Sequence, residues 1–135
     1  MNIPFLGRRR DSSEPRDPEG IAELLSECEL LRDQAYRAGV QLDDSVASLE
    51  ALDQLVPGWR DDAEILPWLG NDAGLYLGTV LVRTVADAGW VIRQDGQPVV
   101  HLASGREFDV VAAGQEWAAS GVPELSQLYA EVAES

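Results

Sequence analysis

Apolar residues recur every three or four positions between Pro18 and Gly39, the spacing that places side chains on one face of a helix. Asp17 is a suitable cap before this stretch, proline suits the first helical position, and glycine suits the residue just past the end. The pattern predicts one helix over residues 18–38. Its buried stripe is Ile21, Leu24, Leu25, Cys28, Leu31 and Ala35, with Cys28 as a small core residue rather than a nucleophile.

A second helix is predicted to begin near Asp43 or Asp44, with these acids as a cap, and to end before Pro57. Its buried positions are Val46, Leu49, Leu52 and either Leu55 or Val56. A polar bend follows over residues 59–64. We expect the two tryptophans around this bend, Trp59 and Trp68, to close over the core.

The third predicted helix covers residues 69–85 and is apolar around nearly its whole circumference, which is typical of a helix buried on most sides. Gly70, Gly74 and Gly78 form one ridge along it. Glycine inside a helix costs about 1 kcal/mol relative to alanine, so three of them indicate close approach of another backbone. The polar strip of this helix is Asp72, Tyr76, Thr79 and Arg83, which we expect to be a solvent-facing seam; the alternative is the lining of a small cleft.

After Gly89 the period changes to two, which is typical of strands. Strands are predicted over 90–93, 98–102 and 107–111, joined by Asp-Gly and Ser-Gly turns into a three-stranded antiparallel meander. A short helical turn over 115–120 ends at Gly121, and Pro123 opens a last helix with Leu125, Leu128, Tyr129 and Val132 inside. The fold class is therefore α+β, with N-terminal helices and a C-terminal helix packed with the meander. The predicted organisation is a flexible arm over 1–17 and one domain over 18–135.

The arm combines two kinds of residue, since Ile3, Phe5 and Leu6 precede three consecutive arginines, Arg8 to Arg10. We interpret it as an untethered terminus, because one short apolar cluster gives little membrane affinity. A docking peptide and a weak contact with anionic lipid are the alternatives. The longest apolar run, residues 73–82, is about half of what a membrane span needs, so no span is predicted.

The stretch from Leu69 to Val111 carries a recognisable skeleton: LG..AGLYLGTVLVR, then a tryptophan, then GQPVVHLASGREFDV. It resembles small uncharacterised proteins common in Streptomyces and related actinobacteria, a family of unknown function. The resemblance extends plausibly to residues 48–56. It implies a bacterial, cytoplasmic protein, and it implies no activity and no catalytic residues.

The formal net charge is -14, and all ten basic residues are arginines. Thirteen acids and three arginines lie between residues 19 and 72. Such a charge keeps a protein soluble and disfavours direct nucleic-acid binding by the folded body. One face of the first predicted helix gathers Glu19, Glu23, Glu27, Glu29 and Asp33. Like charges four residues apart are unfavourable, so we hypothesise that this face is a docking surface for a protein partner with a basic surface; a merely solvated face that keeps the protein soluble is the alternative.

Residues for catalysis are scarce. His101, the only histidine, is expected to be a sheet-face residue, and one histidine with one cysteine cannot form a zinc site. No nucleotide-binding or hydrolase motif is present, so neither an enzyme nor a metal or cofactor is predicted. Arg83, at the end of the buried helix, is expected to pair with Asp109 or Glu107; recognition of an anionic ligand is the alternative.

These observations favour a non-enzymatic interaction module, such as an adaptor, a regulator or an immunity-type protein. Two alternatives belong to other classes. One is a small anionic-ligand-binding protein or enzyme that uses the strip Asp72, Tyr76, Thr79 and Arg83. The other is a nucleic-acid mimic that binds a basic protein. The sequence leaves the partner and the oligomeric state open.

Overall fold

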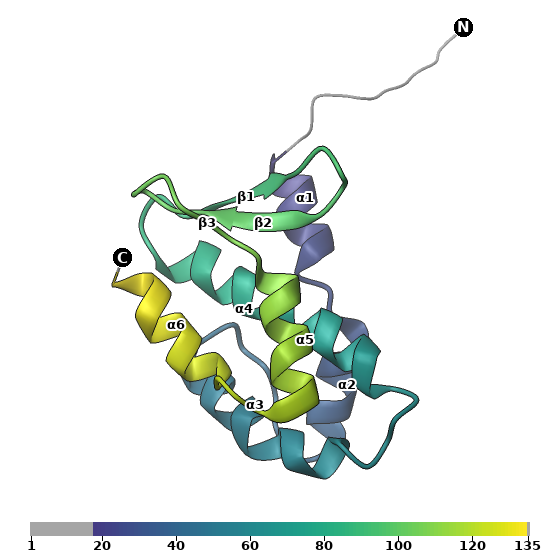
Figure 1. Ribbon diagram of the computed structural model, residues 1–135. Coiled ribbons are helices and arrows are strands. Elements are labelled where there is room, and N and C mark those ends of the chain that lie inside the picture. Colours follow the sequence, from purple (N-terminus) through teal and green to yellow (C-terminus); the bar gives the residue numbers. More distant parts are fainter. Residues whose placement is uncertain (1–17, 135) are drawn as a thin grey trace, which may run out of the picture.

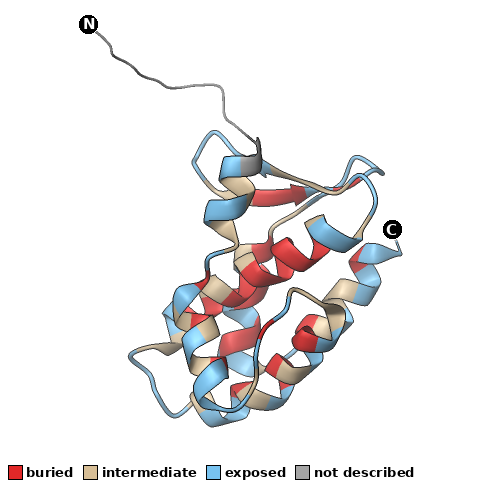
Figure 2. Ribbon diagram, turned by 180° about the vertical axis from the view of Figure 1, so that it is seen from behind, coloured by how far each residue is buried: buried red, intermediate tan, exposed pale blue. Residues whose placement is uncertain are grey.

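Helix α4 (Leu66–Thr84) is the centre of the molecule, with ten buried residues along its length. The computed structural model describes residues 18–134; the predicted arm over 1–17 lies outside them. The other helices are α1 (Pro18–Leu25), α2 (Glu29–Arg37), α3 (Val46–Trp59), α5 (Val110–Ser120) and α6 (Leu125–Ala133). Figure 1 shows a small sheet near one end of α4, with α1 beside it, and Figure 2 shows how much of the central helix is buried. The molecule is α+β, as predicted.

The glycine ridge of α4 is the site of its closest packing, against α5. A Cβ atom added to Gly74 would clash with the backbone of Val110 and Val111, and one added to Gly114 would clash with the backbone of Gly70 and Gly74. The two helices therefore cross with their backbones in contact, which confirms the reason predicted for these glycines. Further along the ridge, Gly78 instead makes room for the indole ring of Trp90.

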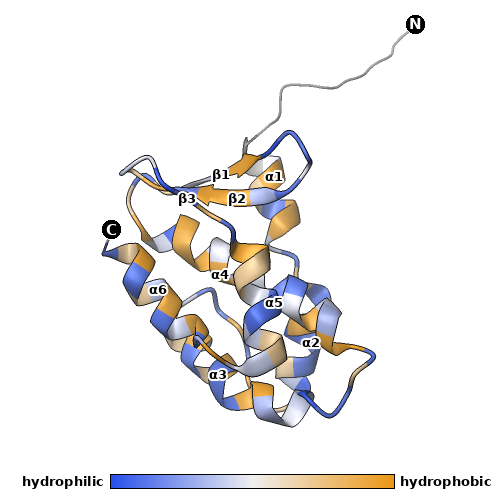
Figure 3. Cartoon of the chain, viewed as in Figure 1, coloured by the Kyte–Doolittle hydropathy of each residue, from blue (hydrophilic) through white to orange (hydrophobic). Residues whose placement is uncertain are grey.

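The sheet has the predicted order and direction. Strands β1 (Gly89–Ile92), β2 (Pro98–His101) and β3 (Glu107–Phe108) pair antiparallel in sequence order, with Trp90 opposite Val100 and Val100 opposite Phe108. Hydrophobic residues on α1, β1 and β2 lie where these elements approach one another (Figure 3). The third strand is shorter than predicted, because the Asp109 side chain accepts a hydrogen bond from the Ala112 amide and starts α5. Helix α5 is correspondingly longer than the predicted turn and ends at Gly121, which has positive φ.

The single helix predicted over 18–38 is wrong. The chain leaves the helical conformation at Ser26 and re-enters it at Glu29, and Cys28 between them is left-handed, with φ of 41°. Arg32 holds this break: its guanidinium donates to the backbone carbonyls of Ser26 and Glu27. Cys28 is buried, as expected, but Leu24 of the predicted inner stripe is 64% exposed.

Two other boundaries differ from the prediction. Helix α3 continues through Pro57 to Trp59, and α6 begins at Leu125 rather than at Pro123. The start of α6 is set by Asp53, a buried residue of α3, whose carboxylate accepts hydrogen bonds from the amides of Leu125 and Ser126. Trp59 packs on the core as expected, whereas Trp68 is 68% exposed.

Candidate functional site

The polar strip of α4 is not the solvent-facing seam that the sequence predicted. Tyr76 is fully buried beneath α2 and the loop before α3, and Thr79 is nearly buried beside α1. The Thr79 hydroxyl donates to the carbonyl of Leu75 in its own helix. The four strip residues therefore do not line one cleft, and the structure gives them separate roles.

Two of the strip residues meet at Asp44, which lies in the left-handed region with φ of 64°. Its carboxylate contacts Arg32 Nη2 at 3.0 Å and Arg83 Nε at 3.1 Å, and its backbone amide donates to the Tyr76 hydroxyl at 2.7 Å. The guanidinium of Arg32 also lies over the Tyr76 ring, 5.2 Å from its centroid. Arg83 is thus paired within the fold, but with Asp44 instead of the expected Asp109 or Glu107.

This cluster carries no sign of activated chemistry. The Tyr76 hydroxyl shares a 2.7 Å hydrogen bond with Ser48, and burial is the main reason that the pKa of Tyr76 is raised, so the phenol stays protonated. The acids that were expected to bind Arg83 instead face Arg93, at 3.8 Å for Glu107 and 3.7 Å for Asp109. The cluster fastens the loop before α3 to α2 and α4.

Asp72, the first strip residue, points toward the start of α2. Cys28 precedes this helix and provides no side-chain cap, and the Asp72 carboxylate accepts a hydrogen bond from the Leu31 amide instead. Partial burial raises the pKa of Asp72 and outweighs the lowering by the amides of Leu31 and Leu30. Asp72 therefore serves as the N-cap of a helix that lies 41 residues earlier in the chain.

The acidic face predicted on the first helix is divided by the break at Cys28. Glu23, on α1, borders a small cavity beside Thr79 and Arg83. Glu27 lies in the break, and Glu29 and Asp33 lie on α2, where Asp33 pairs with Arg37 at 2.8 Å. The side chain of Glu19 lies outside the described residues. The like-charged pair of Glu23 and Glu27 is therefore not on one helix.

The break creates a feature that the sequence did not reveal, a shallow groove of about 700 Å³ between α1, α2 and α4. Two large apolar side chains, Leu24 and Trp68, border it while remaining mostly exposed. Among the described residues that line the groove, none is basic and four are acidic: Glu27, Glu29, Asp33 and Asp72. We call this surface the acidic groove. Its only sequence signal was the density of acids, because Leu24 and Trp68 both matched core patterns.

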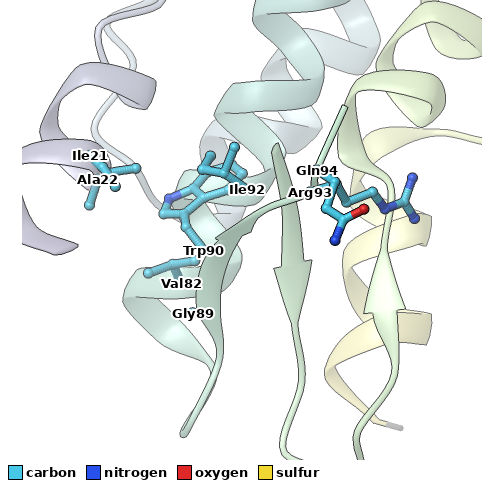
Figure 4. A pocket seen from close by; sticks show the side chains of 8 residues that line it. All are labelled: Ile21, Ala22, Val82, Gly89, Trp90, Ile92, Arg93 and Gln94. Carbon is cyan, nitrogen blue, oxygen red and sulfur yellow. The ribbon is translucent and has the colours of Figure 1, made fainter. Parts of the chain in front are cut away.

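A second groove, of about 740 Å³, lies between α1, α4 and β1, and we call it the Trp90 groove. Figure 4 shows Ile21 and Ala22 of α1 facing Trp90, while Arg93 and Gln94 point away from it. Arg93 is the one charged side chain among its described lining residues. This groove is apolar and carries few groups that would orient a ligand.

The remaining candidates for chemistry are accounted for by their surroundings. Burial raises the pKa of the Cys28 thiol to about 12, so it is not a thiolate at neutral pH. His101 is exposed at the end of β2, opposite Glu107. Within residues 18–134, no three His, Cys, Asp or Glu side chains are grouped so that they could hold a metal ion.

Comparison with known proteins identifies the family. The sequence model of a family of unknown function, DUF6278, matches residues 1–135. The chain belongs to the DUF6278 family. The match covers the whole chain, well beyond the segment of residues 69–111 that suggested an uncharacterised family. No curated protein and no solved structure matches the chain. None of the helices described for this DUF6278 member is long and apolar enough to cross a membrane.

Proposed function

We propose that this protein is an interaction module whose acidic groove binds a basic, partly apolar segment of another protein. The observation that carries the proposal is the exposure of Trp68 and Leu24, at 68% and 64%, in a groove that four acids also line. Protein interfaces combine an apolar centre, in which tryptophan is enriched, with a polar rim. Leu24 and Trp68 would form the centre, and the acids would form the rim.

Two of the four rim acids, Glu27 and Glu29, are available for a partner. Among the described residues, no hydrogen bond or ion pair engages the side chains of Glu27 or Glu29, whereas Asp44 and Asp53 are bonded within the fold. Unpaired acids on a rim raise the association rate of a basic partner and exclude an acidic one. The net charge of -14 extends this attraction beyond the groove.

A titration with a defined probe tests the proposal. The probe is a synthetic amphipathic peptide with one leucine face and one arginine face, about five helical turns long. Binding to the isotope-labelled full chain is followed by NMR, and we expect the amide signals of residues 24–33 and 68–75 to shift. Trp68→Ala should weaken binding roughly thirtyfold, as expected for a tryptophan at the centre of an interface.

Charge variants separate the groove from general attraction. Changing Glu27, Glu29 and Asp33 to their amides should weaken binding roughly tenfold or more at low salt, and much less at high salt. The matched control changes three exposed acids outside the groove, Glu50, Glu116 and Glu134, to glutamine. Equal weakening in both triple variants, or shifts spread over the whole surface, would mean that the peptide senses only net charge and that the proposal is wrong.

A further inference from the structure

The chain itself contains a segment that is basic and partly apolar, as the proposed partner of the acidic groove would be. Residues 3–10 read IPFLGRRR and combine Ile3, Phe5 and Leu6 with three consecutive arginines. Only seven other arginines and no lysines occur in the chain, so this segment is its most concentrated basic element. It lies outside the described residues, and the first described helix, α1, leads directly to the groove through Leu24.

We propose that residues 3–10 bind in the acidic groove of the same molecule and compete there with the partner. This inference rests on the proposed function of the groove. The apolar residues of the segment would cover Leu24 and Trp68, the two large side chains that the fold leaves exposed. The arginines would face Glu27, Glu29 and Asp33, with which they can form charge-assisted hydrogen bonds.

The length of the chain permits this contact. About ten residues separate Arg8 from Pro18, and an extended chain of that length spans roughly 33 Å. Helix α1 advances only about 9 Å from Pro18 to Leu24. A tether of this length holds the segment at an effective concentration of about 1 mM, so a contact with a Kd of about 0.1 mM would fill the groove roughly nine-tenths of the time.

Charge selects the acidic groove over the Trp90 groove as the binding site. The Trp90 groove is as close to the start of α1 and offers the apolar side chains Ile21, Val82 and Trp90. Among its described lining residues there is no carboxylate that could pair with the three arginines. The acidic groove provides Glu27 and Glu29, which have no partner among the described residues, with Asp33 beside them.

Occupation by the chain's own segment would set the affinity for the partner. If the segment fills the groove nine-tenths of the time, the apparent Kd of a competing ligand rises about tenfold. Changing Arg8, Arg9 and Arg10 together to glutamate would release the groove. The synthetic peptide should then bind about tenfold tighter than it binds the parent chain.

Paramagnetic relaxation measures the contact in the full chain. Asn2→Cys provides an attachment site for a nitroxide, and the buried Cys28 should not react, which labelling of the parent chain verifies. We expect the nitroxide to broaden the amide signals of residues 24–33 and 68–75. The Arg8, Arg9 and Arg10 to glutamate variant should lose this broadening, and so should the amide variant of Glu27, Glu29 and Asp33. The control variant of Glu50, Glu116 and Glu134 should keep it.

Three results would overturn the inference. One is broadening centred on Ile21, Val82 and Trp90, which would place the segment in the Trp90 groove. The second is broadening of an isotope-labelled chain by a separate nitroxide-labelled chain, which would show binding between two copies. The third is no broadening above that of the arginine variant. In each case, peptide binding at the acidic groove still decides the proposed function independently.

Discussion

Replacing Asp53 by alanine should remove a large part of the stability of the fold, although no basic residue among those described pairs with Asp53. Its carboxylate accepts four hydrogen bonds: from Trp117 Nε1 at 2.9 Å, the Leu125 amide at 2.8 Å, and the amide and hydroxyl of Ser126 at 3.2 and 2.7 Å. Trp117 is fully buried, so its indole N–H would find no water in place of the carboxylate.

The expected loss is the sum of two effects. A buried donor left without a partner costs about 1–3 kcal/mol. Loss of the N-cap of a helix, here α6, costs roughly 0.5–2 kcal/mol. Asp53→Ala should therefore lower the free energy of unfolding by about 1.5–5 kcal/mol, against a total of about 5–15 kcal/mol for domains in general. Asp53→Asn keeps one acceptor oxygen and should cost roughly half as much.

Urea unfolding followed by circular dichroism measures these losses. A double-mutant cycle with Trp117→Phe isolates the indole bond, because phenylalanine keeps the ring in place and removes the N–H. Asp53→Ala should cost less in the Trp117→Phe background than in the parent. An Asp53→Ala loss below about 1 kcal/mol, or losses that simply add in the double variant, would refute the idea that Asp53 anchors α5 and α6 to α3.

Three further predictions concern α4 and the residues bonded to it. Gly74→Ala should destabilise the fold by several kcal/mol or prevent folding, because the new Cβ would clash with the backbone of α5. The control Gly58→Ala has open space around the new Cβ and should be neutral or slightly stabilising. Equal melting temperatures of the two variants would contradict this. Arg83→Met should lower the free energy of unfolding by at most about 1 kcal/mol, because the arginine is exposed. Asp44→Ala should cost more, because two arginines lose their partner. A reversed order of the two losses in urea unfolding would be evidence against the Asp44 cluster. Because the pKa of Asp72 is raised in the folded state, protonation of Asp72 favours folding. This contribution to the free energy of unfolding is present at low pH and is lost as the pH rises from about 4 through the folded-state pKa. Over that pH window the parent chain should lose stability relative to the Asp72→Asn variant. A difference in the free energy of unfolding that stays constant with pH would exclude this role of Asp72.

The periodicity of the sequence was sufficient to predict the central helix and the sheet, and insufficient to predict which apolar residues remain on the surface. The glycine ridge of Gly70, Gly74 and Gly78 and the change to a two-residue period after Gly89 are both visible as local sequence patterns, and both were confirmed. The break at Cys28 has a long-range cause, because Arg32 and Asp72 hold the ends of α1 and α2 from outside the break. A helical pattern continues across such a break, so periodicity alone could not locate it.

The candidate groove depends on that break, which explains why the sequence predicted only part of it. Glu27, Glu29 and Asp33 were recognised as acids of an interaction surface, but they were assigned to one helix face. Leu24 was assigned to the core because an apolar side chain at helical spacing looks the same whether the fold covers it or not. Trp68 was assigned there because a tryptophan beside the polar bend was expected to close over the core. Only the placement of α1 against α4 shows that these two remain exposed.

The capping of α2 by Asp72 and of α6 by Asp53 has a consequence for the order in which the chain can fold. Each of these helices has nine residues and no side-chain cap of its own, and helices this short are marginal in isolation. During synthesis, Leu31 of α2 emerges 41 residues before Asp72, whose carboxylate caps this helix. For α6 the order is reversed: Asp53 emerges 72 residues before Leu125, whose amide donates to its carboxylate. Helix α2 gains its cap once α4 has emerged, and the Asp53 hydrogen bonds to α6 form only when the C-terminal residues are available, so the complete fold should form late in translation.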